Sequence, residues 1–70
     1  MIHQEIHQLI RVGDRLPNAE VRRLLQGLYD KYKIKRKAKA TDVTFFGFIT
    51  KRTIISVDGK RKEGIRIIRG

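Results

Sequence analysis

The sequence predicts an α+β fold in which helices occupy the first half of the chain and a β-hairpin occupies the second half. Apolar residues recur at helical spacing before the basic centre of the chain, whereas the second half is rich in Ile, Thr and Phe. The 70 residues include 40% hydrophobic ones and no cysteine. We therefore expect a single small domain over residues 1–70, held by packing or by a partner rather than by disulfides.

Residues 2–12 are predicted to form the first helix. Gly13 suits the left-handed position that follows a helix end. The apolar residues of this segment recur on one helical face: Ile2, Ile6, Leu9 and Ile10.

A second helix is predicted at about 18–32. Its start is marked either by Asn18 as the N-cap or by Pro17 in the first helical position. Glu20 lies in the first turn, where the helix dipole favours an anion. One apolar stripe runs along the segment: Val21, Leu24, Leu25, Leu28, Tyr29 and Tyr32. We expect both tyrosines to belong to the core.

A short third helix is predicted at about 38–46, with Val43 and Phe46 turned inward. An alternative start is a cap formed by Thr41 and Asp42. The preceding segment, residues 33–40, is too basic for a buried strand. Phe45 and Phe46 are adjacent, so a short element cannot bury both rings equally. The less buried ring is a candidate for base stacking or a protein contact.

The rest of the chain predicts a hairpin of strands at 48–57 and 64–69 around an Asp58–Gly59 turn signal. The connection is longer than two residues, so we expect an open, mobile tip. Three helices followed by a two-stranded hairpin is the order of a winged helix-turn-helix, with the hairpin as its wing. An isolated hairpin is only marginally stable, so the helices should cover its apolar face.

The charge balance predicts a polyanionic partner. Lys and Arg number 17, Asp and Glu number 7, and the net charge is +10, which favours nucleic acid. Six cations lie between residues 31 and 39 with no acid among them. The cations of the hairpin tip could bind DNA or merely protect a sheet edge from aggregation. The residues expected to bind nucleic acid are Lys33, Lys35, Arg36, Lys37, Lys39, Thr41, Thr44, Lys60, Arg61 and Lys62.

The sequence contains no catalytic arrangement, so we expect a protein that is not an enzyme and has no cofactor. His3 and His7 are four residues apart, but two ligands are too few for a zinc site. No apolar run could span a membrane, and helix one lacks the basic residues of a membrane-surface helix. The N-terminus lacks targeting signals, which predicts a cytoplasmic location. RNA binding, or docking and dimerisation through the apolar face of helix one, are the alternative functions.

Residues 16–68 resemble the winged-helix modules attached to phage and plasmid replication proteins of the primase-helicase type. The resemblance lies in residues 24–30, 35–42, 58–61 and 64–68. It implies a DNA-binding role in replication or transcription control, without primase or ATPase residues in this chain. It also implies either a domain of a larger replication protein, which would then be the partner, or a stand-alone relative. A homodimer is the alternative partnership, through the apolar face of helix one. In such modules the third helix and the hairpin contact DNA, which corresponds here to Lys37, Lys39, Thr41, Thr44, Lys60, Arg61 and Lys62.

Overall fold

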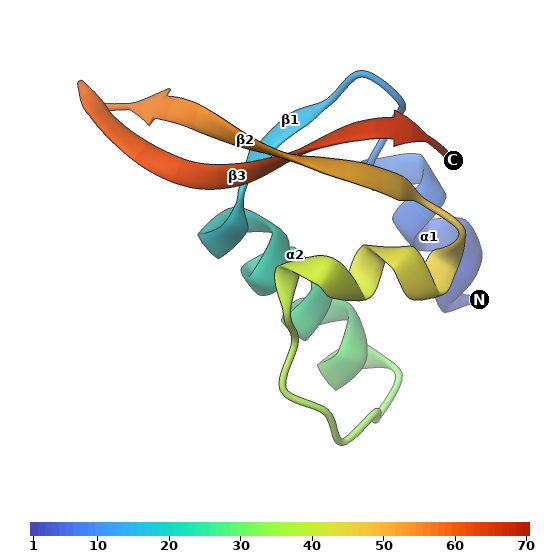
Figure 1. Ribbon diagram of the computed structural model, residues 1–70. Coiled ribbons are helices and arrows are strands. Elements are labelled where there is room, and N and C mark those ends of the chain that lie inside the picture. The colour runs from blue at the N-terminus through green and yellow to red at the C-terminus, as the bar shows by residue number, and fades with distance from the viewer.

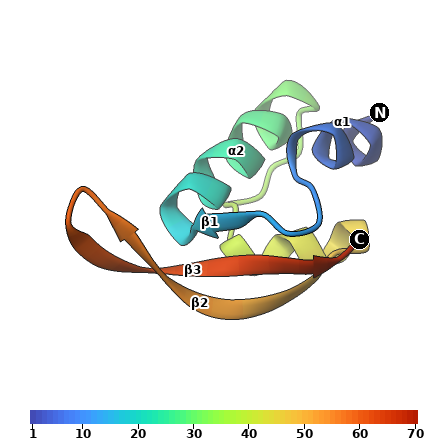
Figure 2. The same cartoon turned by 90° about the horizontal axis from the view of Figure 1, so that it is seen from above.

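The computed structural model describes all 70 residues as an α+β fold with helices on one side of a three-stranded antiparallel sheet (Figures 1 and 2). The strand order in the sheet is β1-β3-β2. Along the chain the elements are α1 (Ile2–Leu9), β1 (Arg15–Pro17), α2 (Asn18–Lys31), the 3₁₀ helix η1 (Ala40–Phe46), β2 (Ile49–Val57) and β3 (Lys60–Arg69).

The predicted winged helix-turn-helix, with three helices followed by a two-stranded hairpin, is wrong. A third strand, β1, lies between α1 and α2 and pairs with β3, so that Arg15 is opposite Arg66 and Pro17 is opposite Gly64. The strand has only three residues, one of them a proline, and its partner follows about 50 residues later. A segment this short carries no period-2 pattern, so local signals could not reveal it.

The two α-helices occupy the predicted regions with shorter ends. Helix α1 ends at Leu9 rather than at residue 12, because the backbone of Ile10 is already extended. The chain then lies against β3, where the Gly13 N–H donates to the Ile67 carbonyl at 2.8 Å. Helix α2 begins at Asn18, as predicted, but its N-cap residue is Pro17, and the oxygen of the Asn18 side chain has no hydrogen-bond partner. Neither predicted capping role, Asn18 as N-cap or Pro17 in the first helical position, is therefore correct.

The third helix is a 3₁₀ helix over Ala40–Phe46 rather than an α-helix over 38–46. A 3₁₀ helix has three residues per turn, so residues three apart share a ridge. One ridge is Ala40, Val43 and Phe46, which faces the core, and another is Thr41 and Thr44, which is exposed. The Lys39 N–H donates to Oδ2 of Asp42 at 3.2 Å and closes the first turn.

The hairpin has a tight two-residue turn, so the predicted open tip is wrong. Asp58 and Gly59 both have positive φ, 51° and 77°, as a type I′ turn requires. Lys60 to Glu63 belong to β3 and pair with Val57 to Ile54. Backbone hydrogen bonds continue through this polar stretch because they do not depend on apolar side chains. The tip projects beyond the helices in Figures 1 and 2.

The core lies between the helices and the inner face of the sheet. Tyr29 is 2% exposed, which confirms its predicted core position, while Tyr32 is partly buried against the core. On β3, Ile65 and Ile67 are buried, and Arg66 between them is exposed on the opposite face. The buried hydrophobic residues are Ile6, Ile10, Val21, Leu25, Leu28, Tyr29, Ala38, Ala40, Val43, Phe48, Ile65 and Ile67.

Candidate nucleic-acid interface

Three cationic residues form a row across all three strands on the outer face of the sheet, which faces away from the helices. Arg15 on β1 is opposite Arg66 on β3, and Arg66 is opposite Lys51 on β2. Residues directly opposite in an antiparallel sheet point to the same face with Cβ atoms about 4.5–5.5 Å apart. All three side chains are exposed. We call Arg15, Lys51 and Arg66 the cationic row.

Two further cations with the same side-chain parity lie toward the hairpin tip, where Lys62 lines a hollow with Glu20 and Arg23 of α2. Lys62 and Lys60 follow Arg66 at intervals of two residues and therefore have the same side-chain parity. Gly64 lies on β3 between Lys62 and the cationic row. A side chain at this position would collide with the side chain of Ile55. The residues of the three strands that share this parity include no carboxylate: Arg15, Pro17, Ile49, Lys51, Thr53, Ile55, Val57, Lys60, Lys62, Gly64, Arg66 and Ile68.

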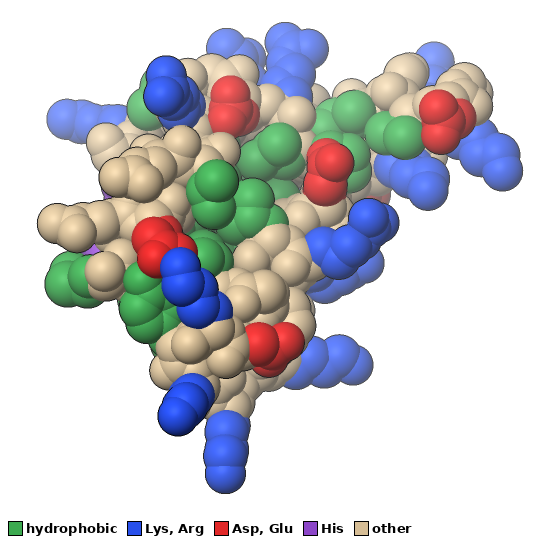
Figure 3. Space-filling model, turned by 180° about the vertical axis from the view of Figure 1, so that it is seen from behind, with side chains coloured by type: hydrophobic (Ala, Val, Ile, Leu, Met, Phe, Trp, Pro, Cys, Tyr) green, Lys and Arg blue, Asp and Glu red, His purple; other side chains and the backbone are tan.

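Few of the cations are neutralised within the molecule. Only three of the 17 Lys and Arg residues form ion pairs: Lys31 with Glu5, Arg36 with Asp42, and Arg52 with Glu63. Figure 3, a view of the rear face, shows Lys and Arg side chains projecting around its edge, with apolar side chains gathered toward its centre. The molecule therefore presents positive charge on several faces.

The predicted interface residues do not form one surface. The loop that carries Lys33 and Lys35 lies at the opposite end of α2 from the hairpin tip in Figures 1 and 2. Lys37 lines a shallow hollow together with Arg22 and Arg23 of α2. Lys39 is exposed just before η1. The basic segment before η1 and the hairpin tip are thus two separate cationic regions.

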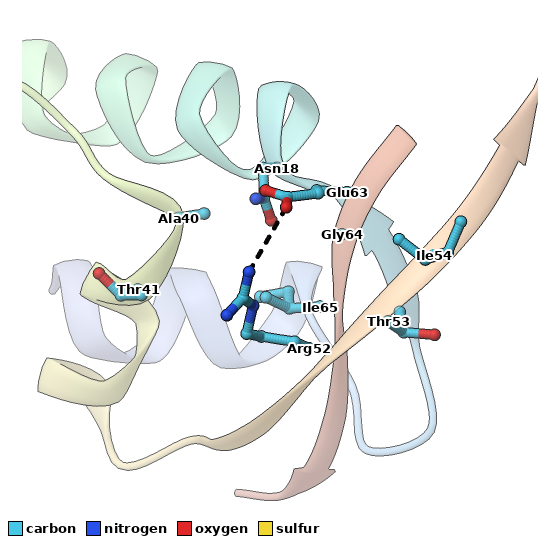
Figure 4. A pocket seen from close by; sticks show the side chains of 9 residues that line it. All are labelled: Asn18, Ala40, Thr41, Arg52, Thr53, Ile54, Glu63, Gly64 and Ile65. Carbon is cyan, nitrogen blue, oxygen red and sulfur yellow. Dashed lines mark hydrogen bonds and ion pairs between the residues drawn. The ribbon is translucent and has the colours of Figure 1, made fainter. Parts of the chain in front are cut away.

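A groove separates the 3₁₀ helix from the inner face of the hairpin (Figure 4). Thr41 lies on one wall, and Arg52 projects from β2 on the other, with its guanidinium 3.4 Å from the Glu63 carboxylate. The groove has a volume of about 240 Å³. Asn18 also lines it, and its buried side-chain oxygen has no hydrogen-bond partner. A hydrogen-bond donor from a ligand would satisfy this oxygen.

Arg36 has a structural role that the sequence analysis did not predict. Its Nε and one terminal nitrogen donate to the two oxygens of Asp42 at 3.0 and 3.1 Å. The Asp42 carboxylate is buried and also accepts from the Tyr29 hydroxyl at 3.0 Å. The hydrogen bonds from Arg36 hold the pKa of Asp42 below its usual value, although burial alone would raise it. Arg36 thus anchors the loop to η1 rather than projecting as a free cation.

The remaining predicted residues differ in what they touch. Thr44 is exposed, and its hydroxyl donates to the Thr41 carbonyl at 2.9 Å. Lys60, Arg61 and Lys62 are exposed within β3, with Arg61 on the opposite face from the two lysines.

His7 packs on Phe48, with ring centroids 4.2 Å apart. Nowhere do three or more His, Cys, Asp or Glu side chains gather as metal ligands.

The sequence analysis did not predict the cationic row, although the residues around the hairpin turn specify part of it. Lys51 and Arg66 are equally far from the turn at Asp58–Gly59, so a two-residue turn by itself predicts that they are opposite each other. We instead expected a longer connection, which hides this register. Arg15 carried no such signal, because its place beside Arg66 depends on the unforeseen strand β1.

Comparisons with protein-family models, with curated proteins and with solved structures gave no match. The resemblance to replication-protein modules therefore stays a prediction. None of the helices is sufficiently long and apolar to cross a membrane.

Proposed function

We propose that this chain is a non-catalytic nucleic-acid-binding module that holds duplex DNA mainly through its phosphates. The observation that supports this most strongly is the cationic row. Like charges directly opposite each other destabilise a sheet, and no carboxylate of the strands shares their face. A polyanion laid across the sheet would offset this repulsion, because duplex DNA carries one negative charge per about 1.7 Å of its axis.

The side chains available favour phosphate contacts over base recognition. Lys and Thr predominate on the exposed surfaces of the segment 37–44. No Arg, Asn or Gln occurs between residues 38 and 46 to form the bidentate base contacts that carry most sequence specificity. The cationic row and Lys60 and Lys62 would contact the backbone, and the separate loop lysines would add attraction at longer range. We expect modest sequence specificity.

The apolar face of α1 is largely buried in the core of the molecule, which argues against docking or dimerisation through this face. Ile6 and Ile10 are buried in the core, and Ile2 packs against it, so that of the four apolar residues only Leu9 is well exposed. The resemblance to replication-protein modules supports a role in replication or transcription control. A cytoplasmic location, and a larger replication protein as partner, belong to the same proposal.

The test is a pair of double charge reversals measured against one DNA duplex. Lys51→Glu with Arg66→Glu removes two members of the cationic row. Arg22→Glu with Arg23→Glu makes the same change in net charge on α2, on the helical side of the sheet. We expect the first variant to weaken binding at least about tenfold more than the second, about 1.4 kcal/mol. Equal losses would mean that DNA responds only to net charge.

The salt dependence of the wild type completes the test. Five phosphate contacts, from the three residues of the cationic row and from Lys60 and Lys62, predict a slope of log K against log salt of roughly −4.5 for duplex DNA. The Lys51→Glu, Arg66→Glu variant should have a shallower slope than the wild type. Duplex RNA of the same sequence, titrated in parallel, identifies the preferred duplex. Wild-type protein that binds neither duplex at low salt would refute the proposal.

A further inference from the structure

Phe45 is an exposed aromatic residue whose position follows from the geometry of η1. The 3₁₀ ridge that faces the core takes up Phe46, and Phe48 is buried after the helix ends. Phe45 shares a ridge with Asp42, but Asp42 is buried at the start of the helix while Phe45 is 65% exposed one turn later. Phe45 is the only aromatic side chain among the exposed large hydrophobic residues, and an exposed aromatic ring is a surface on which a base can stack.

The ring of Phe45 is held in place by a fixed cation. The guanidinium carbon of Arg36 lies 5.0 Å from the ring centroid, within the range of a cation–π interaction. Arg36 cannot move freely, because both oxygens of the buried Asp42 carboxylate accept hydrogen bonds from it. The chain of contacts from Tyr29 through Asp42 and Arg36 to Phe45 therefore links an exposed ring to the core.

The charge around this ring indicates the chemistry of its partner. Lys35 and Lys37 flank Arg36 in the sequence, and Lys39 follows, all exposed and without an ion pair. Asp42, the acid of this segment, is already neutralised by Arg36. A partner must therefore combine a planar apolar group with negative charge. A nucleobase that is not stacked in a duplex, together with its phosphates, provides both.

We infer that Phe45 is a stacking platform for an unpaired base of nucleic acid, with Arg36 as the residue that positions the ring. This inference rests on the proposed nucleic-acid function and narrows it. The module would prefer DNA that has a single-stranded or bulged base beside a duplex. The unpaired base stacks on Phe45, and the phosphates next to that base lie against the exposed cations of the adjoining loop, Lys35, Lys37 and Lys39.

The experiment compares a DNA duplex that carries a single-base bulge with the same duplex fully paired. Phe45→Leu keeps an apolar side chain but removes the ring. We expect it to weaken binding of the bulged DNA about tenfold and of the paired DNA less than twofold. Leu9→Ala is the matched control, because Leu9 is also exposed, on α1, and it should change neither. Stacking releases no counterions, so Phe45→Leu should leave the salt slope unchanged.

A second variant gives a direct signal of stacking. The chain has two tyrosines but no tryptophan, so Phe45→Trp introduces a single tryptophan, which retains an aromatic ring and can be excited separately from the tyrosines. Its fluorescence should be quenched by bulged DNA and single-stranded DNA, but not by the paired duplex, and its affinity should match that of the wild type. Single-stranded RNA of the same sequence shows whether an RNA base is an equal ligand, which would also support stacking.

The outcomes separate this inference from the function on which it rests. Suppose that the wild type binds both DNAs, and that Phe45→Leu weakens binding of both equally or changes binding of neither. The stacking platform is then refuted, while nucleic-acid binding stands. A Phe45→Trp protein that binds bulged DNA without quenching also refutes it. If the wild type binds no DNA or RNA probe, the proposed function itself fails.

Discussion

At the scale of single residues, Asp42 shows how a buried charge is kept in this small core. Its side chain is 1% exposed and accepts hydrogen bonds from the Arg36 side chain, the Tyr29 hydroxyl and the Lys39 N–H. Removing one partner of such a network leaves the others unsatisfied. Because Arg36 is itself partly exposed, we expect Asp42→Asn to destabilise the fold by about 2–3 kcal/mol.

The same residue predicts a pH dependence of stability. The pKa of Asp42 is lowered in the folded state, chiefly by Arg36. Its contribution to stability is therefore fully present above its unfolded-state pKa, about 3.9, and is lost as pH falls through the lower folded-state value. The difference in thermal stability between wild type and Asp42→Asn should be constant and largest above about pH 4, and should shrink as pH falls from about 4 towards about 2. A difference that stays constant over this lower range would contradict the assignment.

Lys51 provides a prediction in which stability and binding change in opposite directions. Lys51→Glu replaces a repulsive pair with Arg66 by an attractive one across the strands, so we expect the fold to gain about 0.2–1 kcal/mol. The same change should weaken DNA binding. Chemical denaturation and a DNA titration measure the two effects. Lys35→Glu, in an exposed position of the loop beyond the end of α2, is the control that should leave stability nearly unchanged. Loss of both stability and binding would show that the row is a structural feature.

At the scale of elements, the close pairing of β1 and β2 with β3 depends on Gly64. A Cβ at this position would collide with the side chain of Ile55 and lie 2.6 Å from the Leu16 carbonyl oxygen. Because the second contact is with backbone, a change of rotamer cannot relieve it. We expect Gly64→Ala to cost about 1–3 kcal/mol in thermal or chemical denaturation.

A second glycine provides the control for this prediction. A Cβ at Gly27, in the middle of α2, would meet nothing within 4 Å. Gly27→Ala should stabilise the protein by about 0.5–1 kcal/mol, because glycine is a poor helix former. If Gly64→Ala were as harmless as Gly27→Ala, the close approach of β1 to β3 would be incorrect.

At the scale of the whole molecule, the net charge of +10 acts on folding and on binding with opposite signs. Cations without ion pairs repel one another in the compact state. Raising NaCl from about 20 to 200 mM screens this repulsion and should raise the melting temperature. The same change should weaken DNA binding steeply. The Arg22→Glu, Arg23→Glu variant has a smaller net charge, so its melting temperature should rise less. A melting temperature that falls with salt would mean that attractive ion pairs dominate.

Elements with a strong local pattern could be predicted from the sequence, and elements defined by distant partners could not. The apolar stripe of α2 placed that helix within a residue or so of its ends, and both long strands were found from their Ile-rich composition. The tight turn was missed because the polar residues Lys60 to Glu63 conceal a strand whose pairing is made by its backbone. The candidate site was predicted only in part, because Arg36, expected to bind phosphate, is held by a buried carboxylate.

The sequence by itself determined the α+β class, the positions of both α-helices, and the charge that makes a polyanion the natural partner. Periodicity and composition are local properties, and charge is additive along the chain, so none of these needs a three-dimensional arrangement. Only the tertiary structure decided that a third cation joins Lys51 and Arg66, which a two-residue turn already places opposite each other. The pairing of β1 with β3 brings Arg15 beside Arg66, and the packing of the loop on η1 brings Arg36 over Phe45. Both arrangements bring together residues that are not neighbours in the sequence. The residues on either side of each one therefore do not indicate its partner.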